Sequence, residues 1–231
     1  MPIPGVILGG GAGQRMGGVS KPAVMLGGRS LLSHVQARIG GQVSALALAA
    51  RALPMGCDLP LLADCHADRR GPLAGILAGM RWARVAEPEA RFLLSLPCDA
   101  PFLPRDLVAR LRAVAAGEPE ARVIVARSGG VEHRAVALWD IALAEALADV
   151  VERAEDLSIR RFYQRFAHAL CEFAVPPGGP DPFLNINTPQ DLARAEDALG
   201  SSENLEPVIP RDADEGEARG LGLPHGEQGG G

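Results

Sequence analysis

The sequence is short of lysine and asparagine. Its 23 basic residues are 22 arginines and one lysine, Lys21, and its three asparagines are Asn185, Asn187 and Asn204. A deficit of this size indicates a coding bias against A/T-rich codons, so the exceptions are informative. Lys21 lies directly behind a glycine-rich segment, and two of the three asparagines fall in the short stretch 185–187.

Features of several other protein classes are also missing. The N-terminus has no basic segment followed by a cleavage site, which predicts that no signal peptide is present. The longest apolar stretch, residues 43–55, is interrupted by Arg51 and is too short to span a bilayer. No CxxC pair or metal-ligand spacing occurs among the cysteines, so a structural zinc site is not expected; they are Cys57, Cys65, Cys98 and Cys171. A soluble cytoplasmic protein with reduced thiols and no membrane partner is predicted.

There is no basic excess. The net charge is −5, and residues 201–231 account for all of it with seven acids against two bases, which leaves residues 1–200 neutral. A neutral body argues against a nucleic-acid partner. Glycine, proline and acids dominate after about Gly200. We therefore predict one folded domain over residues 1–200 and an acidic, disordered tail over residues 201–231.

Short apolar runs alternate with amphipathic segments along the folded part. This order predicts a single Rossmann-like domain of three α/β/α layers with a mostly parallel sheet. Strands are expected at residues 3–8, 43–49, 59–63, 92–96, 121–126, 131–138 and 170–175, the fifth and sixth forming a hairpin. Helices are expected at residues 30–39, 71–84, 104–116, 139–152 and 157–167, and after the capping sequence Thr188-Pro189-Gln190-Asp191.

A glycine-rich segment, residues 8–21, follows the first expected strand. Successive backbone N–H groups in such a loop form an anion-binding concavity, and Arg15 and Lys21 add positive charge, which predicts phosphate binding. A P-loop would need Gly-Lys-Ser/Thr, whereas Ser20 here precedes Lys21. The pattern G-x-G-x-x-G also fails, because Gln14 stands where its third glycine is needed. A flexible surface loop is the alternative.

A single carboxylate, Asp99, follows the apolar run 92–96. Ligands bind outside the carboxyl ends of parallel strands, so Asp99 is expected at the same edge as the glycine-rich segment. Mg²⁺ is held by one or two carboxylates plus phosphate oxygens, which makes Asp99 the candidate metal ligand. Its alternative role is to cap the next helix, for which Asp106 is better placed. The adjacent Cys98 is interpreted as a buried strand-end residue rather than a nucleophile.

Four motifs together resemble the molybdenum cofactor guanylyltransferase family, the MobA-type enzymes, over about residues 1–198. They are residues 8–21, Asp64 followed by 71–75, Cys98-Asp99-Ala100-Pro101, and 183–189. The family pattern has Ala where this chain has Gly9 and Asp where it has Ser20. His133 resembles part of a family His-Pro segment, with Arg134 in place of the proline, and Ala49 or Ala50 replaces a frequent asparagine.

The resemblance implies a nucleotide-diphospho-sugar transferase-like fold and transfer of GMP from GTP to the terminal phosphate of (Mo-)molybdopterin, with release of pyrophosphate. Mg²⁺ would be the cofactor, and transient contacts with cofactor-biosynthesis proteins and molybdoenzymes would follow. Lys21, Arg15 and Asp99 would be catalytic, and Asp99 would hold the metal. The residues implied to contact nucleotide are Leu8, Gly10, Gly11, Lys21, Asp64, Gly71, Gly75 and Asp99, and Asn185 and Asn187 are implied to face the pterin.

Three other functions stay open at this level. A molybdopterin cytidylyltransferase would share the fold and use CTP. Such relatives typically have glycine before the strand-end aspartate and lack the stretch 71–75, so Cys98 and that stretch favour GTP. A sugar-phosphate nucleotidyltransferase is the second. A non-catalytic molybdopterin carrier is the third, although it would not require both the glycine-rich segment and Asp99.

Overall fold

A sheet of seven strands runs through the computed structural model, which describes residues 1–10, 20–62, 71–153 and 157–200. The strands in chain order are β1 (Gly5–Leu8), β4 (Leu46–Ala49), β5 (Leu61–Leu62), β6 (Phe92–Pro97), β7 (Val123–Ser128), β8 (Val131–Asp140) and β9 (His168–Phe173). A separate two-stranded hairpin is formed by β2 (Met25–Leu26) and β3 (Arg29–Ser30).

The strands lie in the order β5-β4-β1-β6-β8-β7-β9. β8 is antiparallel to both of its neighbours, and the remaining pairs are parallel. The predicted mostly parallel sheet is therefore confirmed. The predicted hairpin of β7 and β8 is also confirmed, and it turns at Gly129 and Gly130, which both have positive φ (53° and 80°).

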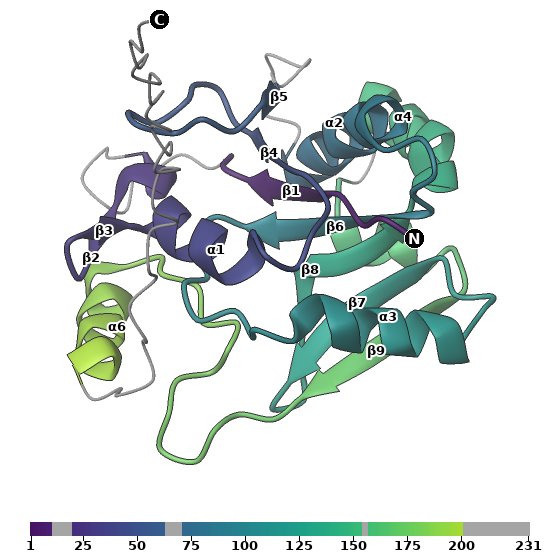
Figure 1. Cartoon of the computed structure of the whole chain (residues 1–231). Helices are drawn as coiled ribbons and strands as arrows, with labels where there is room; N and C mark the ends of the chain where they lie inside the picture. The colour runs from purple at the N-terminus through teal and green to yellow at the C-terminus, as the bar shows by residue number, and fades with distance from the viewer. Residues whose placement is uncertain (11–19, 63–70, 154–156, 201–231) are drawn as a thin grey trace, which may run out of the picture.

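Helices cover both faces of the sheet (Figure 1). They are α1 (Leu31–Ile39), α2 (Gly71–Ala86), α3 (Leu107–Gly117), α4 (Ala144–Arg153), α5 (Ile159–Tyr163) and α6 (Pro189–Gly200), with short 3₁₀ segments η2 (Lys21–Ala23) and η3 (Ile141–Leu143). α1 and α3 share one hydrophobic cluster with the sheet, whereas α2, α4 and α5 share another. The predicted three-layer α/β/α architecture is confirmed. No helix in these ranges is long and apolar enough to cross a membrane.

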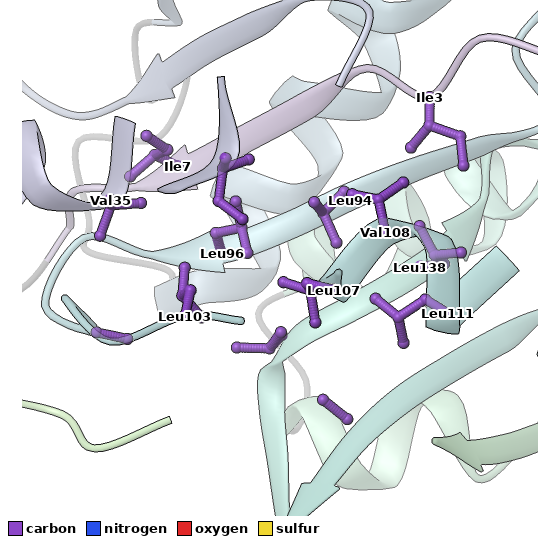
Figure 2. Close-up of a cluster of buried hydrophobic side chains, with 14 of the residues drawn as sticks. Ile3, Ile7, Val35, Leu94, Leu96, Leu103, Leu107, Val108, Leu111 and Leu138 are labelled. Atoms are coloured by element: carbon purple, nitrogen blue, oxygen red, sulfur yellow. The ribbon is translucent and has the colours of Figure 1, made fainter. Parts of the chain in front are cut away.

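The two central strands are buried on both faces. Ile7 of β1 and Leu94 of β6 belong to the cluster with α1 and α3 (Figure 2), whereas Val6 and Leu93 belong to the cluster with α2. Because neither face of these strands meets water, their sequences are mostly apolar rather than alternating. The polar exception is Ser95 of β6, whose hydroxyl donates to Ala135 O and accepts from Trp139 Nε1, both at 2.8 Å. This packing holds the carboxyl ends of β1 and β6 side by side, with Leu8 opposite Pro97.

Several boundaries differ from those expected. The helix expected over 104–116 begins at Leu107, because Gln42 from another segment accepts a hydrogen bond from Val108 N at 3.0 Å and donates one to Pro104 O at 2.9 Å. The side chain of Asp106 makes no capping bond there.

Other differences are in length. The strands expected over 43–49 and 59–63 shrink to β4 and β5, and the last strand, expected over 170–175, begins at His168. The predicted start of the helix over 139–152 is wrong, because β8 continues to Asp140, which pairs with Phe92 of β6. The 3₁₀ segment η3 follows, and α4 begins at Ala144. The helix expected over 157–167 is reduced to α5, and the hairpin of β2 and β3 was not expected.

Candidate active site

Three polar side chains from distant segments meet at the carboxyl edge of the sheet. Lys21 Nζ donates hydrogen bonds to Asp99 Oδ2 at 2.6 Å and to Asn187 Oδ1 at 2.5 Å. Lys21 and Asp99 also form an ion pair, in which 20% of the Lys21 side chain and 8% of the Asp99 side chain are exposed. A cation, an anion and a neutral amide thus share one partly buried point, which we call the Lys21 cluster.

The end of β6 places Asp99. Cys98 N donates to Leu8 O at 3.3 Å, which continues the pairing of β6 with β1 one residue past the strand. The carbonyl of Asp99 accepts a hydrogen bond from Ile186 N at 2.9 Å. Asp99 is therefore fixed between the central strand β1 and the segment that carries Asn187, where parallel α/β sheets bind ligands.

The opposite end of the cluster is fixed by close packing behind Lys21. The residue begins η2, and the next residue, Pro22, is buried. A Cβ added to Gly9 would lie 3.0 Å from Ala50 Cβ and 3.3 Å from Pro22 Cγ. A larger residue at position 9 would require these neighbours to move by a few tenths of an ångström, so the end of β1 and the start of η2 are in close contact.

The start of α2 adjoins the same edge. A Cβ on Gly75 would lie 2.8 Å from Leu8 Cδ2 and 3.3 Å from Ala49 Cβ, so the helix packs closely on the ends of β1 and β4. Gly71, the first residue of α2, has a φ of +67°, which glycine adopts without strain, and a Cβ there would meet nothing within 4 Å. Leu8, Gly71 and Gly75 therefore lie on one side of the edge.

On the other side of Asp99 lies a cleft of 590 Å³. Its lining includes two guanidinium-bearing residues, Arg134 and Arg160, together with Asn185. Pro97 and Asn185 bring the cleft within two residues of Asp99 and Asn187 along the chain. Glu132 and Asp181 also line the cleft, and Glu132 Oε2 lies 3.3 Å from Arg134 Nε, so a ligand there would meet charges of both signs and an amide.

His133 forms a wall of the cleft. Its Nε2 lies 2.7 Å from Ser128 Oγ, which donates to Asp181 Oδ2 at 2.7 Å, and its ring lies 4.7 Å from the ring of Phe183 between centroids. Burial lowers the pKa of His133 below its usual value, although the nearby Asp181 acts in the opposite direction. Because the Ser128 hydroxyl donates its proton to Asp181, it does not donate it to His133, so these three side chains form a structural bridge between the β7–β8 hairpin and residues 181–183.

Cys98 is not equipped to act as a nucleophile. It is 2% exposed, and burial raises the pKa of its thiol to about 12, with a smaller contribution from Asp99. Because the thiolate is the nucleophilic form, this thiol is inert at neutral pH. The interpretation of Cys98 as a buried strand-end residue is confirmed.

The predicted site residues are distributed as follows. The structure brings Lys21, Asp99 and Asn187 into contact, places Leu8 and Gly75 together beside them, and puts Asn185 in the cleft. Gly10 is exposed. Gly11, Arg15 and Asp64 lie outside the described residues.

Sequence reasoning did not find Arg160 or the pair of Glu132 and Tyr163, whose hydroxyl donates to Glu132 Oε2 at 2.6 Å. The only sequence feature that pointed to this region was the segment 132–134, because His133 resembles part of the family His-Pro segment.

The donor set at the edge suits a divalent metal that also binds phosphate. Within the described ranges there is no group of three or more His, Cys, Asp or Glu residues that could hold a metal ion. Asp99 is a single buried carboxylate at a strand end. One carboxylate together with substrate phosphate oxygens and water is a common ligand set for Mg²⁺, so the residues present fit such an ion.

The chain is similar in sequence and fold to known proteins. A family model described as MobA-like NTP transferase domain matches residues 5–170. A molybdenum cofactor guanylyltransferase of Rhodopseudomonas palustris (strain HaA2) is 46% identical over 196 residues, which cover 84% of this chain and 90% of the relative.

Two solved structures share the fold. The molybdopterin-guanine dinucleotide biosynthesis protein A of Archaeoglobus fulgidus has a TM-score of 0.68 at 21% identity and covers 86% of this chain and 100% of its own. A Mycobacterium tuberculosis H37Rv protein in complex with manganese has a TM-score of 0.57 at 20% identity, with the same coverage of both chains.

Proposed function

Because the chain belongs to the MobA-like NTP transferase family, we propose that it transfers GMP from GTP to the terminal phosphate of molybdopterin and releases pyrophosphate. The guanylyl specificity is supported by the 46% identity to a relative named for that activity over most of both chains. The observation that carries the chemistry is the contact of Lys21 Nζ with Asp99 Oδ2 at the carboxyl edge of the sheet.

The reaction exchanges one phosphoanhydride for another. An oxygen of the acceptor phosphate forms a bond to the α-phosphorus of GTP, and the bond from that phosphorus to the bridging oxygen of pyrophosphate breaks. A phosphate monoester is largely dianionic at neutral pH, so the acceptor needs no general base. Catalysis then rests on aligning two anions and neutralising the charge that develops around the α-phosphate.

Lys21 supplies positive charge from the protein. Its ammonium has three donors and is a compact cation suited to phosphate oxygens. In the free protein two of these donors are directed to Asp99 and Asn187. We assign Lys21 to the nucleotide phosphates, together with Arg15, Gly10 and Gly11 of the glycine-rich segment.

Asp99 is the residue that would hold Mg²⁺. When bound, the metal would neutralise phosphate charge and fix the orientation of the triphosphate. Asp99 is buried, its backbone carbonyl accepts the Ile186 N–H, and its carboxylate accepts from Lys21 Nζ, so the residue is already ordered at the position where a ligand would meet it.

The two substrates are assigned to opposite sides of Asp99. Leu8, Gly71 and Gly75 border the guanosine side, with Asp64 expected near the base. The cleft lined by Arg134, Arg160 and Asn185 is assigned to the acceptor, because the two guanidinium groups can bind a phosphate once Arg134 exchanges its ion pair with Glu132 for the ligand. The tilted ring pair of His133 and Phe183 forms a wall of this cleft.

We also propose a cytoplasmic location, where GTP is available. The product would be passed on through transient contacts with cofactor-biosynthesis proteins and molybdoenzymes. Cross-linking in cells followed by identification of the captured proteins tests these contacts, and capture of unrelated proteins alone would contradict them.

The activity is tested by adding Mg²⁺, molybdopterin and either GTP or CTP to purified protein and measuring pyrophosphate. We expect release with GTP and much less with CTP. Equal or faster release with CTP would replace the guanylyl assignment with the cytidylyl one. Binding of molybdopterin without pyrophosphate release from either nucleotide would support the carrier function.

A further inference from the structure

The two asparagines of the segment 185–187 serve different neighbours. Asn185 is exposed and lines the cleft assigned to the acceptor. The side-chain oxygen of Asn187 instead accepts a hydrogen bond from Lys21 Nζ at 2.5 Å. Ile186, which lies between them, is 1% exposed and anchors the segment by donating its N–H to Asp99 O.

The start of α6 fixes Asn187. Asp191 Oδ2 accepts hydrogen bonds from Asn187 N at 3.1 Å and from Thr188 N at 2.9 Å, and Thr188 Oγ1 accepts one from Asp191 N at 3.1 Å. This is the reciprocal capping arrangement of a helix N-terminus. Hydrogen bonds, first from Thr188 and then from Asn187, lower the pKa of Asp191, so the cap stays ionised at neutral pH.

α6 is in turn anchored to the rest of the molecule. Ala195 of the helix and Ile186 belong to one buried cluster with Leu26 of the β2–β3 hairpin, next to which α6 lies in Figure 1. The same hairpin follows η2, which begins with Lys21. The helix cap and the lysine are therefore parts of one packed unit.

We propose that Asn187 is a positioning residue for the Lys21 ammonium and thus serves the nucleotide, whereas Asn185 serves the acceptor. This inference rests on the proposed function. Lys21 has two acceptors in the free protein, and one of them, Asp99, is the carboxylate that the metal would require. With Asp99 holding the metal, the Asn187 amide would be the acceptor that keeps Lys21 at the edge, and the other donors of Lys21 would be available to phosphate.

A neutral amide suits this position better than a second carboxylate. A lysine side chain has several rotatable bonds, and holding it in one geometry costs conformational entropy that a fixed acceptor reduces. An aspartate at position 187 would also hold the ammonium, but it would add a negative charge next to the triphosphate. The isosteric substitution Asn187→Asp therefore keeps an acceptor for Lys21 but adds a negative charge near the phosphates, so it tests the two effects separately.

The test is the binding of a non-hydrolysable GTP analogue with Mg²⁺, measured by calorimetry without acceptor. We expect Asn187→Ala to raise Kd about tenfold, because hydrogen bonds to charged groups are among the stronger ones. The matched substitution Asn185→Ala, two residues away, should change this Kd less than twofold and instead raise KM for molybdopterin. Asn187→Asp should weaken nucleotide binding at least as much as Asn187→Ala.

A double-mutant cycle with Lys21→Ala shows whether Asn187 acts through the lysine. In the Lys21→Ala background, Asn187→Ala should have less than a twofold effect, because the group that it positions is gone. Equal tenfold losses in both backgrounds, or wild-type affinity in Asn187→Ala together with a raised KM for molybdopterin, would overturn the assignment. If Asn187→Ala does not fold, wild-type affinity in Asn187→Asp would overturn it.

The outcomes also distinguish this inference from the proposed function. Wild-type protein that does not bind the GTP analogue would overturn both. Normal binding by the wild type that is insensitive to position 187 would overturn only the role of Asn187.

Discussion

At the scale of single residues, Lys21 is the side chain on which the site depends. It is the sole lysine in a chain with 22 arginines, and it bonds to partners 78 and 166 positions away. An arginine would place a larger planar group where a compact ammonium fits between a carboxylate and an amide. The coding bias against lysine makes its retention here consistent with a chemical requirement.

We predict that Lys21→Met lowers kcat/KM for pyrophosphate release about 10²–10³-fold, the loss typical for one group that stabilises transition-state charge. Methionine keeps much of the side-chain stem but leaves the mostly buried Asp99 carboxylate without its cation, so the unfolding midpoint should also fall, and turnover is measured well below it. Arg29→Ala is the matched control, because it removes an exposed cation from the neighbouring strand β3. If Lys21→Met turned over as fast as Arg29→Ala, Lys21 would have no catalytic role.

His34 makes a pH-dependent contribution to stability. Its side chain is buried on α1, with Nε2 2.9 Å from the carbonyl of Leu26, and burial is the main cause that lowers its pKa. The folded state therefore binds protons less readily than the unfolded state, in which the pKa is about 6.5. The stabilisation is present above that pH and is lost as the pH falls through the folded-state value.

We therefore predict that lowering the pH from 7.5 to 5.5 decreases the urea concentration at which half of the wild-type protein is unfolded. His34→Gln should make this decrease smaller. Part of the fall should persist, because burial also lowers the pKa of His133. His168→Gln, which removes a histidine ring at an exposed position, is the matched substitution with which the effect of His34→Gln is compared. An identical fall in wild type and His34→Gln would show that His34 does not contribute.

The sequence predicted which residues belong to the site better than it predicted which of them contact one another. Lys21 and Asp99 were expected at one sheet edge because each follows a strand or its loop, and the register of β1 with β6 places them there. The bond from Lys21 to Asn187 could not be predicted, because it depends on how α6 docks against the β2–β3 hairpin. No periodicity in the sequence encodes that docking.

At the scale of elements, α2 packs unusually close to the sheet. A Cβ on Gly79 would lie 2.7 Å from Val6 Cγ1 and 2.9 Å from Leu93 Cδ2, distances that real side chains do not reach. Alanine in a helix interior is normally favoured over glycine by about 0.5–1 kcal/mol. Overpacking a core costs about 1–3 kcal/mol, so here the clash exceeds the gain in helix propensity.

We predict that Gly79→Ala lowers the free energy of unfolding by roughly 1–2 kcal/mol, the net of those two effects. Gly117→Ala, at the last residue of α3, is the control, because a Cβ there meets nothing within 4 Å. It should be neutral or stabilising by up to about 1 kcal/mol. Urea unfolding of both variants measures the difference, and equal changes of the same sign would contradict the packing argument.

Element boundaries were predicted well where local chemistry sets them and poorly where tertiary contacts do. The start of α6 is fixed by Thr188 and Asp191 in its own first turn, and it lies where the capping sequence predicts. α3 instead begins three residues late because Gln42, 66 positions away, supplies the acceptor for Val108 N. The β2–β3 hairpin has only two residues in each strand, too few for an alternating pattern.

At the scale of the whole molecule, the order and direction of the strands determine where the two proposed substrate regions lie along one edge of the sheet. The parallel strands β5, β4, β1 and β6 end at the nucleotide side, whereas β8 runs the other way and brings residues 131–136 to the cleft. The mostly parallel sheet and the family membership were predicted from sequence and are confirmed. The insertion of β8 between β6 and β7 was not predicted, because apolar runs indicate strands but not their order.

Charge divides the chain at the same scale, and this division gives a last prediction. Residues 201–231 carry the full −5, and the described members of the site all lie between Leu8 and Asn187, before α6 ends at Gly200.

We propose that residues 1–200 form the catalytic unit. Removing residues 202–231 should leave kcat/KM for GTP within about twofold and the unfolding midpoint unchanged, because every described element and every described member of the site precedes residue 201. Pyrophosphate release by the shortened and full-length chains, compared at low and physiological salt, measures this. A loss of tenfold or more at physiological salt would make the acidic segment part of the site, whereas a rise confined to low salt would show that its charge merely repels the anionic substrates.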